Sequence, residues 1–284
     1  MTGRQAAARG LWLAAAWLPA VVLIVLPLAS FLAYSLFRVE GGEIIHQPGL
    51  ANYARFFGEG VFLPVFLRTC LLAAEVAAIT VLVGYPVAIW LASLAGRRKL
   101  AMTLAFAVPL LMSYIIKIYA IRAILGSQGW LNSLLLWTGV ISTPIEALLF
   151  NLTAVLITLS ILLLPFTILP ILVALERIPR GLFEASADLG ASAWATFRWV
   201  TWPLSRRGVL IGASFTFVLA LGDFVTPQMV GGMSGITFGR IVYSQFGLAF
   251  NWPFGAALAV IMTAVVLAVL WLANTLGRPP AEAR

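Results

Sequence analysis

Six long apolar runs, joined by short polar stretches, dominate this chain. Most are at or above the roughly 20 residues that an α-helix needs to cross the hydrocarbon core of a membrane. The runs cover residues 11–37, 65–95, 100–116, 145–175, 208–230 and 253–276. The pattern predicts an all-α, polytopic membrane protein with six transmembrane helices.

The first run has the length of a membrane span rather than of a signal peptide. It follows Arg4 and Arg9, as a signal peptide would, but its apolar stretch is longer than the short core of such a peptide. Trp17 near one end and Tyr34 near the other are typical of side chains at the two membrane interfaces. We expect this segment to remain in the chain as its first span.

Composition supports the membrane assignment. Of the 284 residues, 62% are hydrophobic and only 10% are charged, and the mean hydropathy is +1.03. Six spans with short connections leave little room for a separate soluble domain, and no internal repeat is visible. We therefore expect a single transmembrane domain over residues 1–284.

The net charge of +8 does not indicate a nucleic-acid partner, because the basic residues form short clusters at the ends of apolar runs. With six spans, twelve of the 18 Lys and Arg fall on one side of the membrane. The positive-inside rule places that side, with both termini, in the cytoplasm. The twelve are Arg4, Arg9, Arg97, Arg98, Lys99, Arg177, Arg180, Arg198, Arg206, Arg207, Arg278 and Arg284.

Several kinds of chemistry are absent from the sequence. With Cys70 as the single cysteine and His46 as the single histidine, neither a disulfide framework nor a His/Cys metal site can be drawn. No glycine-rich phosphate loop precedes Lys99 or Lys117, so we expect this chain to bind no ATP and no other cofactor. No arrangement of Ser with His, or of paired Asp, suggests an intramembrane enzyme. We predict no catalytic and no metal-binding residues.

The cytoplasmic segment 176–207 does not read as a passive connector. A short amphipathic helix can begin at Pro179 and stop at Gly190. A second fits residues 192–201, with Ser192 as its N-cap and Pro203 beyond its end. The apolar side chains of two such helices must either fold back onto the ends of the spans or dock a partner.

Within this segment, Glu184-Ala185-Ser186-Ala187-Asp188-Leu189-Gly190, followed by Trp202-Pro203-Leu204, resembles the EAA signature of the membrane subunits of binding-protein-dependent ABC importers. The sequence departs from the usual signature at two points: a serine stands at the third position, and Trp-Pro replaces the usual Leu-Pro. The resemblance implies that residues 184–190 form a coupling helix, which sits in a groove of an ATPase subunit.

Further fragments resemble the spermidine/putrescine branch, most closely its B-type permease subunits. They are Asn52-Tyr53-Ala54-Arg55-Phe56-Phe57, Val108-Pro109, Ile118-Tyr119, Gly129-Trp130-Leu131-Asn132, the stretch 136–144, Gly222-Asp223-Phe224-Val225-Thr226-Pro227 and Trp252-Pro253-Phe254-Gly255-Ala256-Ala257. The resemblance implies a type I importer in a bacterial inner membrane. Its partners would be a second permease, favoured as a related chain in a heterodimer, two ATPase subunits that use ATP and Mg²⁺, and a periplasmic solute-binding protein.

Carboxylates inside apolar runs are costly enough to require a partner or a function. Asp223, beside Phe224, is our main candidate for the solute pathway, since a carboxylate next to an aromatic face can hold an ammonium group. Glu75, Tyr85 and Tyr119 are further pathway candidates. The structural alternatives for Asp223 are an ion pair with Arg68, Lys117 or Arg122, or capping of a broken helix before Pro227.

By resemblance, a polyamine is the expected solute, carried by alternating access. Importers of the same class for another amine, an opine, an amino acid derivative or an anion remain alternatives. A self-contained channel or secondary carrier would also accommodate six spans with buried carboxylates. The segment 176–207 argues against it, because a self-contained carrier needs no docking segment.

Overall fold

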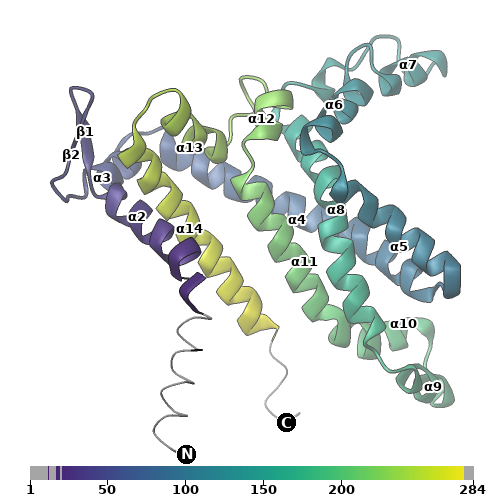
Figure 1. Cartoon of the computed structure of the whole chain (residues 1–284). Helices are drawn as coiled ribbons and strands as arrows, with labels where there is room; N and C mark the ends of the chain where they lie inside the picture. Colours follow the sequence, from purple (N-terminus) through teal and green to yellow (C-terminus); the bar gives the residue numbers. More distant parts are fainter. Residues whose placement is uncertain (1–11, 13–16, 20, 278–284) are drawn as a thin grey trace, which may run out of the picture. The chain divides into compact units, whose positions relative to one another are not determined.

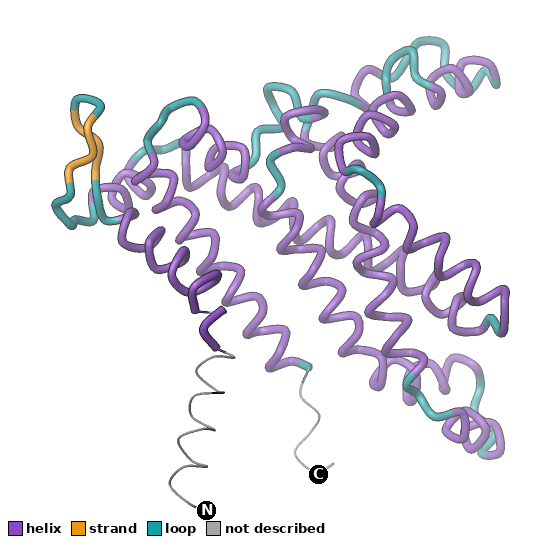
Figure 2. Tube along the Cα trace, viewed as in Figure 1, coloured by secondary structure: helices purple, strands orange, loops and turns teal. Residues whose placement is uncertain are grey.

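The computed structural model of this protein describes residues 12, 17–19 and 21–277. The described residues form two compact units, one from the residues up to Leu63 together with Val242–Ala264, the other from Pro64–Ile241 together with the residues from Val265 onward. Figures 1 and 2 show that helices make up almost all of the regular structure in the described part of the chain. The elements are η1 (Val21–Val25), α2 (Leu26–Ser35), β1 (Arg38–Glu40), β2 (Glu43–Ile45), α3 (Ala51–Gly58), α4 (Phe62–Ser93), α5 (Gly96–Leu111), α6 (Tyr114–Leu125), α7 (Trp130–Trp137), η2 (Glu146–Leu148), α8 (Leu152–Glu176), α9 (Arg180–Asp188), α10 (Ala193–Thr196), η3 (Phe197–Thr201), α11 (Trp202–Gly222), α12 (Val225–Val230), α13 (Phe238–Gly247) and α14 (Trp252–Leu276).

Five helices among the described residues are long and apolar enough to cross a membrane, and a bent pair makes a sixth if it counts as one span. The prediction of an all-α, polytopic fold is confirmed. The side on which the termini lie stays a prediction, because most of the N-terminal tail and residues 278–284 fall outside the described part. The five helices are Trp17–Ser35, Phe62–Ser93, Leu152–Glu176, Ala193–Gly222 and Trp252–Leu276.

The third predicted span is not one straight helix over 100–116. Helix α5 ends at Leu111, and the chain bends by 102° between Gly96–Leu111 and Tyr114–Trp137. Pro109 removes a backbone N–H from the last turn of α5, and Met112 leaves the helical region with ψ of 149°. The chain therefore turns sharply three residues after Pro109, where the hydropathy pattern predicted an uninterrupted span.

The fifth span differs from the prediction at both of its ends. The predicted short helix 192–201 does not stop before Pro203 but continues into α11, so that one helix runs over Ala193–Gly222. A π-helical turn, η3, ends two residues before the proline and provides the local adjustment for its missing N–H. At the other end, the predicted run to residue 230 breaks after Gly222, and Val225–Val230 is a separate short helix.

One β-hairpin adds to the predicted helices. Strands β1 and β2 pair antiparallel, with Glu40 opposite Glu43, and Gly41 and Gly42 form the two-residue turn. Their φ values of +61° and +88° are those that such a turn requires, and glycine adopts them without strain. A Gly-Gly pair between short strands is a recognised sequence signal for such a hairpin.

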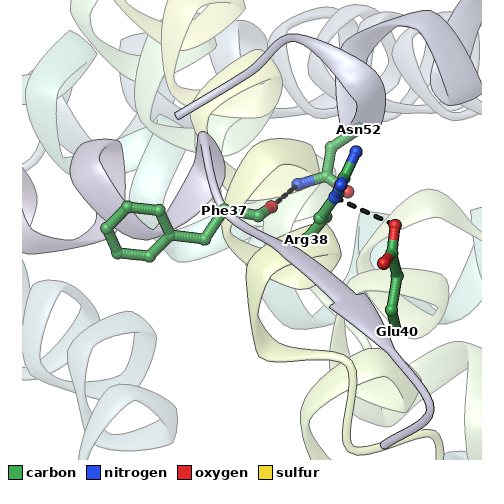
Figure 3. Close-up of polar contacts among 4 residues, drawn as sticks. All are labelled: Phe37, Arg38, Glu40 and Asn52. Atoms are coloured by element: carbon green, nitrogen blue, oxygen red, sulfur yellow. Dashed lines mark hydrogen bonds and ion pairs between the residues drawn. The ribbon is translucent and has the colours of Figure 1, made fainter. Parts of the chain in front are cut away.

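Helix α3 holds the end of α2 in the first unit. The Asn52 Nδ2 atom donates to the carbonyl oxygen of Ser35, the last residue of α2 (2.9 Å), and to that of Phe37, two residues further on (2.6 Å). Figure 3 shows the bond to Phe37 and, beside it, the ion pair between Arg38 and Glu40 at 3.0 Å. The Arg55 guanidinium lies 4.4 Å from the centre of the Phe254 ring. The fragment that begins at Asn52 therefore has a structural role in this unit.

The core of the second unit lies where α4, α8 and α11 meet. The hydroxyl of Thr167 on α8 bonds that of Thr80 on α4 (3.0 Å) and that of Thr216 on α11 (2.7 Å), and all three residues are buried. Gly208 and Gly212 allow the backbones of α11 and α8 to approach closely, because a Cβ on either would lie within 3.0 Å of an α8 atom. Small residues and paired hydroxyls are the usual means of packing membrane helices.

Candidate functional site

The segment 176–207, called the EAA-like segment here, begins where α8 ends. Lys99 and Glu176 form an ion pair of 2.7 Å between the start of α5 and the end of α8. Helix α9 follows and ends near Gly190, whose φ is +72°. The N–H of Gly190 donates to the carbonyl of Ala187 (2.9 Å), and that of Ala191 to the carbonyl of Ser186 (3.1 Å). The predicted first helix and its glycine stop are confirmed.

Ser186 connects α9 with the helix that becomes the fifth span. Its hydroxyl lies 2.6 Å from that of Thr196, and Ser186 is the one α9 residue that is buried. Ser192 caps α10 by accepting from the N–H of Ala195 at 3.2 Å. The serine that departs from the EAA pattern thus makes the side-chain contact between the two helices.

Most of the remaining signature is exposed. Glu184, Ala185, Ala187 and Asp188 lie on the surface of α9, and Leu189 is 87% exposed. A hollow of about 810 Å³ lies between the EAA-like segment and the ends of α4 and α8. Among the described residues, the segment therefore does not fold back fully on the spans, and no other part covers its outer face.

The second candidate site surrounds the break between α11 and α12. Asp223 directly follows the last residue of α11, and its Oδ1 atom accepts from the backbone N–H groups of Val225 (2.9 Å) and Thr226 (3.3 Å). Its Oδ2 atom accepts from the hydroxyl of Tyr114 at 2.7 Å, and that hydroxyl also lies 3.0 Å from the Thr226 hydroxyl. The carboxylate is partly exposed.

Of the structural alternatives for Asp223, capping of the broken helix is the one that the described residues show. The three basic candidates have other contacts: Arg68 donates to the Ser234 carbonyl (2.5 Å), Lys117 to the Pro109 carbonyl (3.0 Å), and Arg122 lies over the Phe150 ring. No ion pair of Asp223 occurs among the described residues. The carboxylate therefore has hydrogen-bond donors around it but no cation within this part of the chain.

The other predicted pathway residues make no contact with Asp223 among the described residues. Glu75 is exposed on α4, and Tyr119 on α6 is 56% exposed. Tyr85 is only 8% exposed, and its hydroxyl lies 2.7 Å from that of Ser205. Tyr114, which the structure does bring to Asp223, was not among the predicted site residues. It is distant in sequence, and no spacing rule connects the two positions.

In the described part of the chain, a polytopic set of helices carries the exposed helix α9 between its fourth and fifth spans and a carboxylate at a helix break, an arrangement that suits a transport component. The family model described as "Binding-protein-dependent transport system inner membrane component" matches residues 84–278. The chain belongs to this family and is a multi-pass protein of the bacterial inner membrane.

Among its relatives are spermidine/putrescine transport system permease proteins PotB. The chain is 32% identical over 264 residues to that of Escherichia coli (strain K12), with 92% of this chain and 94% of the relative covered. It is also 35% identical over 237 residues to the inner membrane ABC transporter permease protein YdcU of the same strain, with 79% and 74% covered.

Solved structures share the fold at lower identity. A chain of a bacterial ABC transporter involved in the import of the acidic polysaccharide alginate matches with a TM-score of 0.75 at 16% identity, covering 96% of this chain and 97% of the other. A chain of the MetNI methionine ABC transporter, in an inward-facing conformation, matches with a TM-score of 0.57 at 20% identity, covering 76% and 94%. These likenesses establish an ABC importer permease fold.

Proposed function

We propose that this chain is a permease subunit of an ATP-driven importer that carries a polyamine, spermidine or putrescine, into the cytoplasm by alternating access. The observation that carries the proposal is the 32% identity to spermidine/putrescine permeases over 92% of the chain. The exposed outer face of the EAA-like segment supports it, because a permease without its own ATP site needs a surface that receives the ATPase.

The complete importer in this proposal contains a second, related permease, two ATPase subunits and a periplasmic solute-binding protein. This chain is not an enzyme and binds no cofactor. ATP and Mg²⁺ belong to the ATPase subunits. Their closure would move the EAA-like segments and rock the spans between inward-open and outward-open states.

The proposed ATPase contact is the surface of residues 184–190. Ala185 and Ala187 allow a neighbouring backbone to approach closely, and Glu184 and Asp188 are placed to pair with basic groups of the ATPase. Leu189 adds an apolar side chain that the described residues leave 87% exposed. Ser186 and Gly190 set the shape of this surface through the Thr196 contact and the backbone turn.

The proposed contact for the solute is Asp223. Its carboxylate has no cation among the described residues, and the aromatic residue Phe224 is its neighbour in the chain, so an ammonium group suits the position. Glu75 and Tyr119 are exposed within apolar helices and suit a surface that faces the second permease or the solute path. The burial of Tyr85 argues against a place for it along that path.

The test is ATP hydrolysis by the assembled importer in lipid nanodiscs, with and without binding protein loaded with spermidine or putrescine. Gly190→Trp places a large side chain on the proposed ATPase contact. Gly139→Trp is a matched control, because Gly139 and Gly190 both have φ of +72° and open space around the Cβ position. We expect loaded binding protein to stimulate hydrolysis in the wild type and the Gly139 variant but not in the Gly190 variant.

Other results would separate the parts of the proposal. Stimulation by a different solute alone would keep the importer and reject the polyamine. Equal loss in both tryptophan variants would reject the EAA-like segment as a specific contact. If no ATPase associates with the permease at all, a channel or secondary carrier becomes the better explanation.

A further inference from the structure

We propose that Tyr85 is a positioning residue for the transport stroke. Through its contact with Ser205, Tyr85 would pass a displacement of the EAA-like segment to helix α4, so that hydrolysis and solute movement stay coupled. This inference rests on the proposed function, because it assumes that an ATPase moves the segment. It assigns to Tyr85 a role inside the protein rather than in contact with the solute.

The contacts of Tyr85 place it at the junction of three elements. It lies on α4, it is 8% exposed, and it belongs to the buried cluster that α4, α8 and α11 share. Its hydroxyl lies 2.7 Å from the Ser205 hydroxyl on α11. Its ring packs edge-on against Phe197 and Trp202, with centroid distances of 6.0 and 5.7 Å.

A short series of contacts leads from this junction to the proposed ATPase surface. Ser186 on α9 bonds Thr196 at 2.6 Å, and Thr196 directly precedes Phe197, one of the two rings against Tyr85. A displacement of α9 therefore reaches Tyr85 through one hydrogen bond, one step of the chain and one aromatic contact. Each contact joins residues from a single compact unit.

The element between α9 and α11 contains an irregular turn that could change its winding. Phe197–Thr201 forms the π-helical turn η3, which lies inside the otherwise continuous helix Ala193–Gly222. Such turns have less favourable backbone geometry than an α-helix and are often found at functional sites. The hollow of about 810 Å³ is lined in part by Thr196, Phe197 and Thr201, so space lies next to this turn.

In this proposal, the hydrogen bond between Tyr85 and Ser205 keeps α4 and α11 together when η3 changes. If η3 changes its winding when α9 moves, the start of α11 shifts relative to Thr196. The rings of Phe197 and Trp202 meet Tyr85 edge-on, but such contacts are favourable over a range of centroid distances of roughly 4.5 to 7 Å, so they tolerate small displacements of α4. A hydrogen bond between two buried hydroxyls is directional, so it makes α4 and α11 move together.

The experiment compares solute uptake with ATP hydrolysis in proteoliposomes that contain the complete importer and external binding protein with spermidine. Tyr85→Phe removes the hydroxyl and keeps the ring, and Ser205→Ala removes the other partner. We expect the number of solute molecules carried per ATP to fall about fivefold in either variant, the factor that corresponds to one ordinary hydrogen bond. ATPase association should be unchanged. The double variant should be no worse than either single variant, because the two hydroxyls act as a pair.

Tyr34→Phe is the control, because Tyr34 is 38% exposed and its hydroxyl makes no hydrogen bond to any other described residue. It should leave the ratio of uptake to hydrolysis unchanged. Proportional losses of uptake and hydrolysis in Tyr85→Phe, or additive effects in the double variant, would overturn the inference and leave Tyr85 as a packing residue. If wild-type hydrolysis does not respond to spermidine-loaded binding protein, the proposed polyamine function fails instead, independently of any result for Tyr85.

Discussion

Asp223 combines two roles that a substitution can separate. One carboxylate oxygen caps α12 through the N–H groups of Val225 and Thr226, while the other accepts from Tyr114. An amide keeps an oxygen for the cap but has no negative charge. The difference between aspartate and asparagine at this position is therefore mainly a difference in charge.

We expect Asp223→Asn to lower spermidine uptake by about tenfold or more, because a charge-assisted contact contributes roughly 1.5 to 3 kcal/mol. The importer should still assemble and retain its thermal stability, since the cap persists. Uptake of labelled spermidine into proteoliposomes measures the effect. Glu59→Gln is the control, because it also neutralises an acid, one that pairs with Arg55 at the surface at 2.7 Å. Normal uptake by Asp223→Asn would remove Asp223 from the pathway.

At the scale of elements, the contact between α8 and α11 depends on the absence of side chains. A Cβ at Gly208 would lie 2.5 Å from the Ala174 Cβ and 2.6 Å from the Pro170 carbonyl oxygen. Neither atom is at the end of a flexible side chain, so the helices would have to separate. Gly222, at the end of the same helix, has open space around its Cβ position.

Gly208→Ala should therefore destabilise the protein by about 1 to 3 kcal/mol, the typical cost of overpacking. Alanine has the higher helix propensity, so propensity alone predicts the opposite sign. Gly222→Ala tests that propensity effect without the clash and should be neutral or slightly stabilising. Thermal unfolding of the purified permease complex in detergent compares the two. Equal stability of both variants would mean that α8 and α11 separate at little cost.

The breaks within the spans are the feature of the helices that the sequence pattern did not predict. The chain bends after Leu111 and stops its fifth span at Gly222, although apolar residues continue past both points. Hydropathy indicates whether a residue is apolar enough for lipid or for a protein interior. The residues after Leu111 and after Gly222 are apolar enough for either, so hydropathy does not reveal the two breaks. Whether the helix continues depends on partners for the freed backbone groups, such as Lys117 at Pro109 and Asp223 at α12.

For the whole molecule, the charge distribution predicts an orientation that labelling can measure. In a Cys70→Ser background, Gly181→Cys places one thiol in the EAA-like segment, and Val140→Cys places one in the loop after α7. Both positions are exposed. In intact spheroplasts, a membrane-impermeant maleimide should label position 140 alone, and position 181 should react only after permeabilisation. The reverse pattern would contradict the cytoplasmic placement of the termini and of the EAA-like segment.

The sequence alone determined the class of the protein. Apolar length predicts membrane helices regardless of how they pack, because each span satisfies its own backbone hydrogen bonds. The stop of α9 at Gly190 was also predictable, since it depends on local backbone geometry. The order of motifs along the chain then identified the family.

Only the tertiary structure decided what individual polar side chains do. Tyr85 and Tyr119 look alike in sequence, yet the first is buried against Ser205 and the second is exposed. Tyr114 reaches Asp223 across more than a hundred residues, as no local pattern could indicate. Burial and hydrogen bonding depend on which helices become neighbours, and that choice is made by packing at positions such as Gly208 and Thr167 rather than by hydropathy.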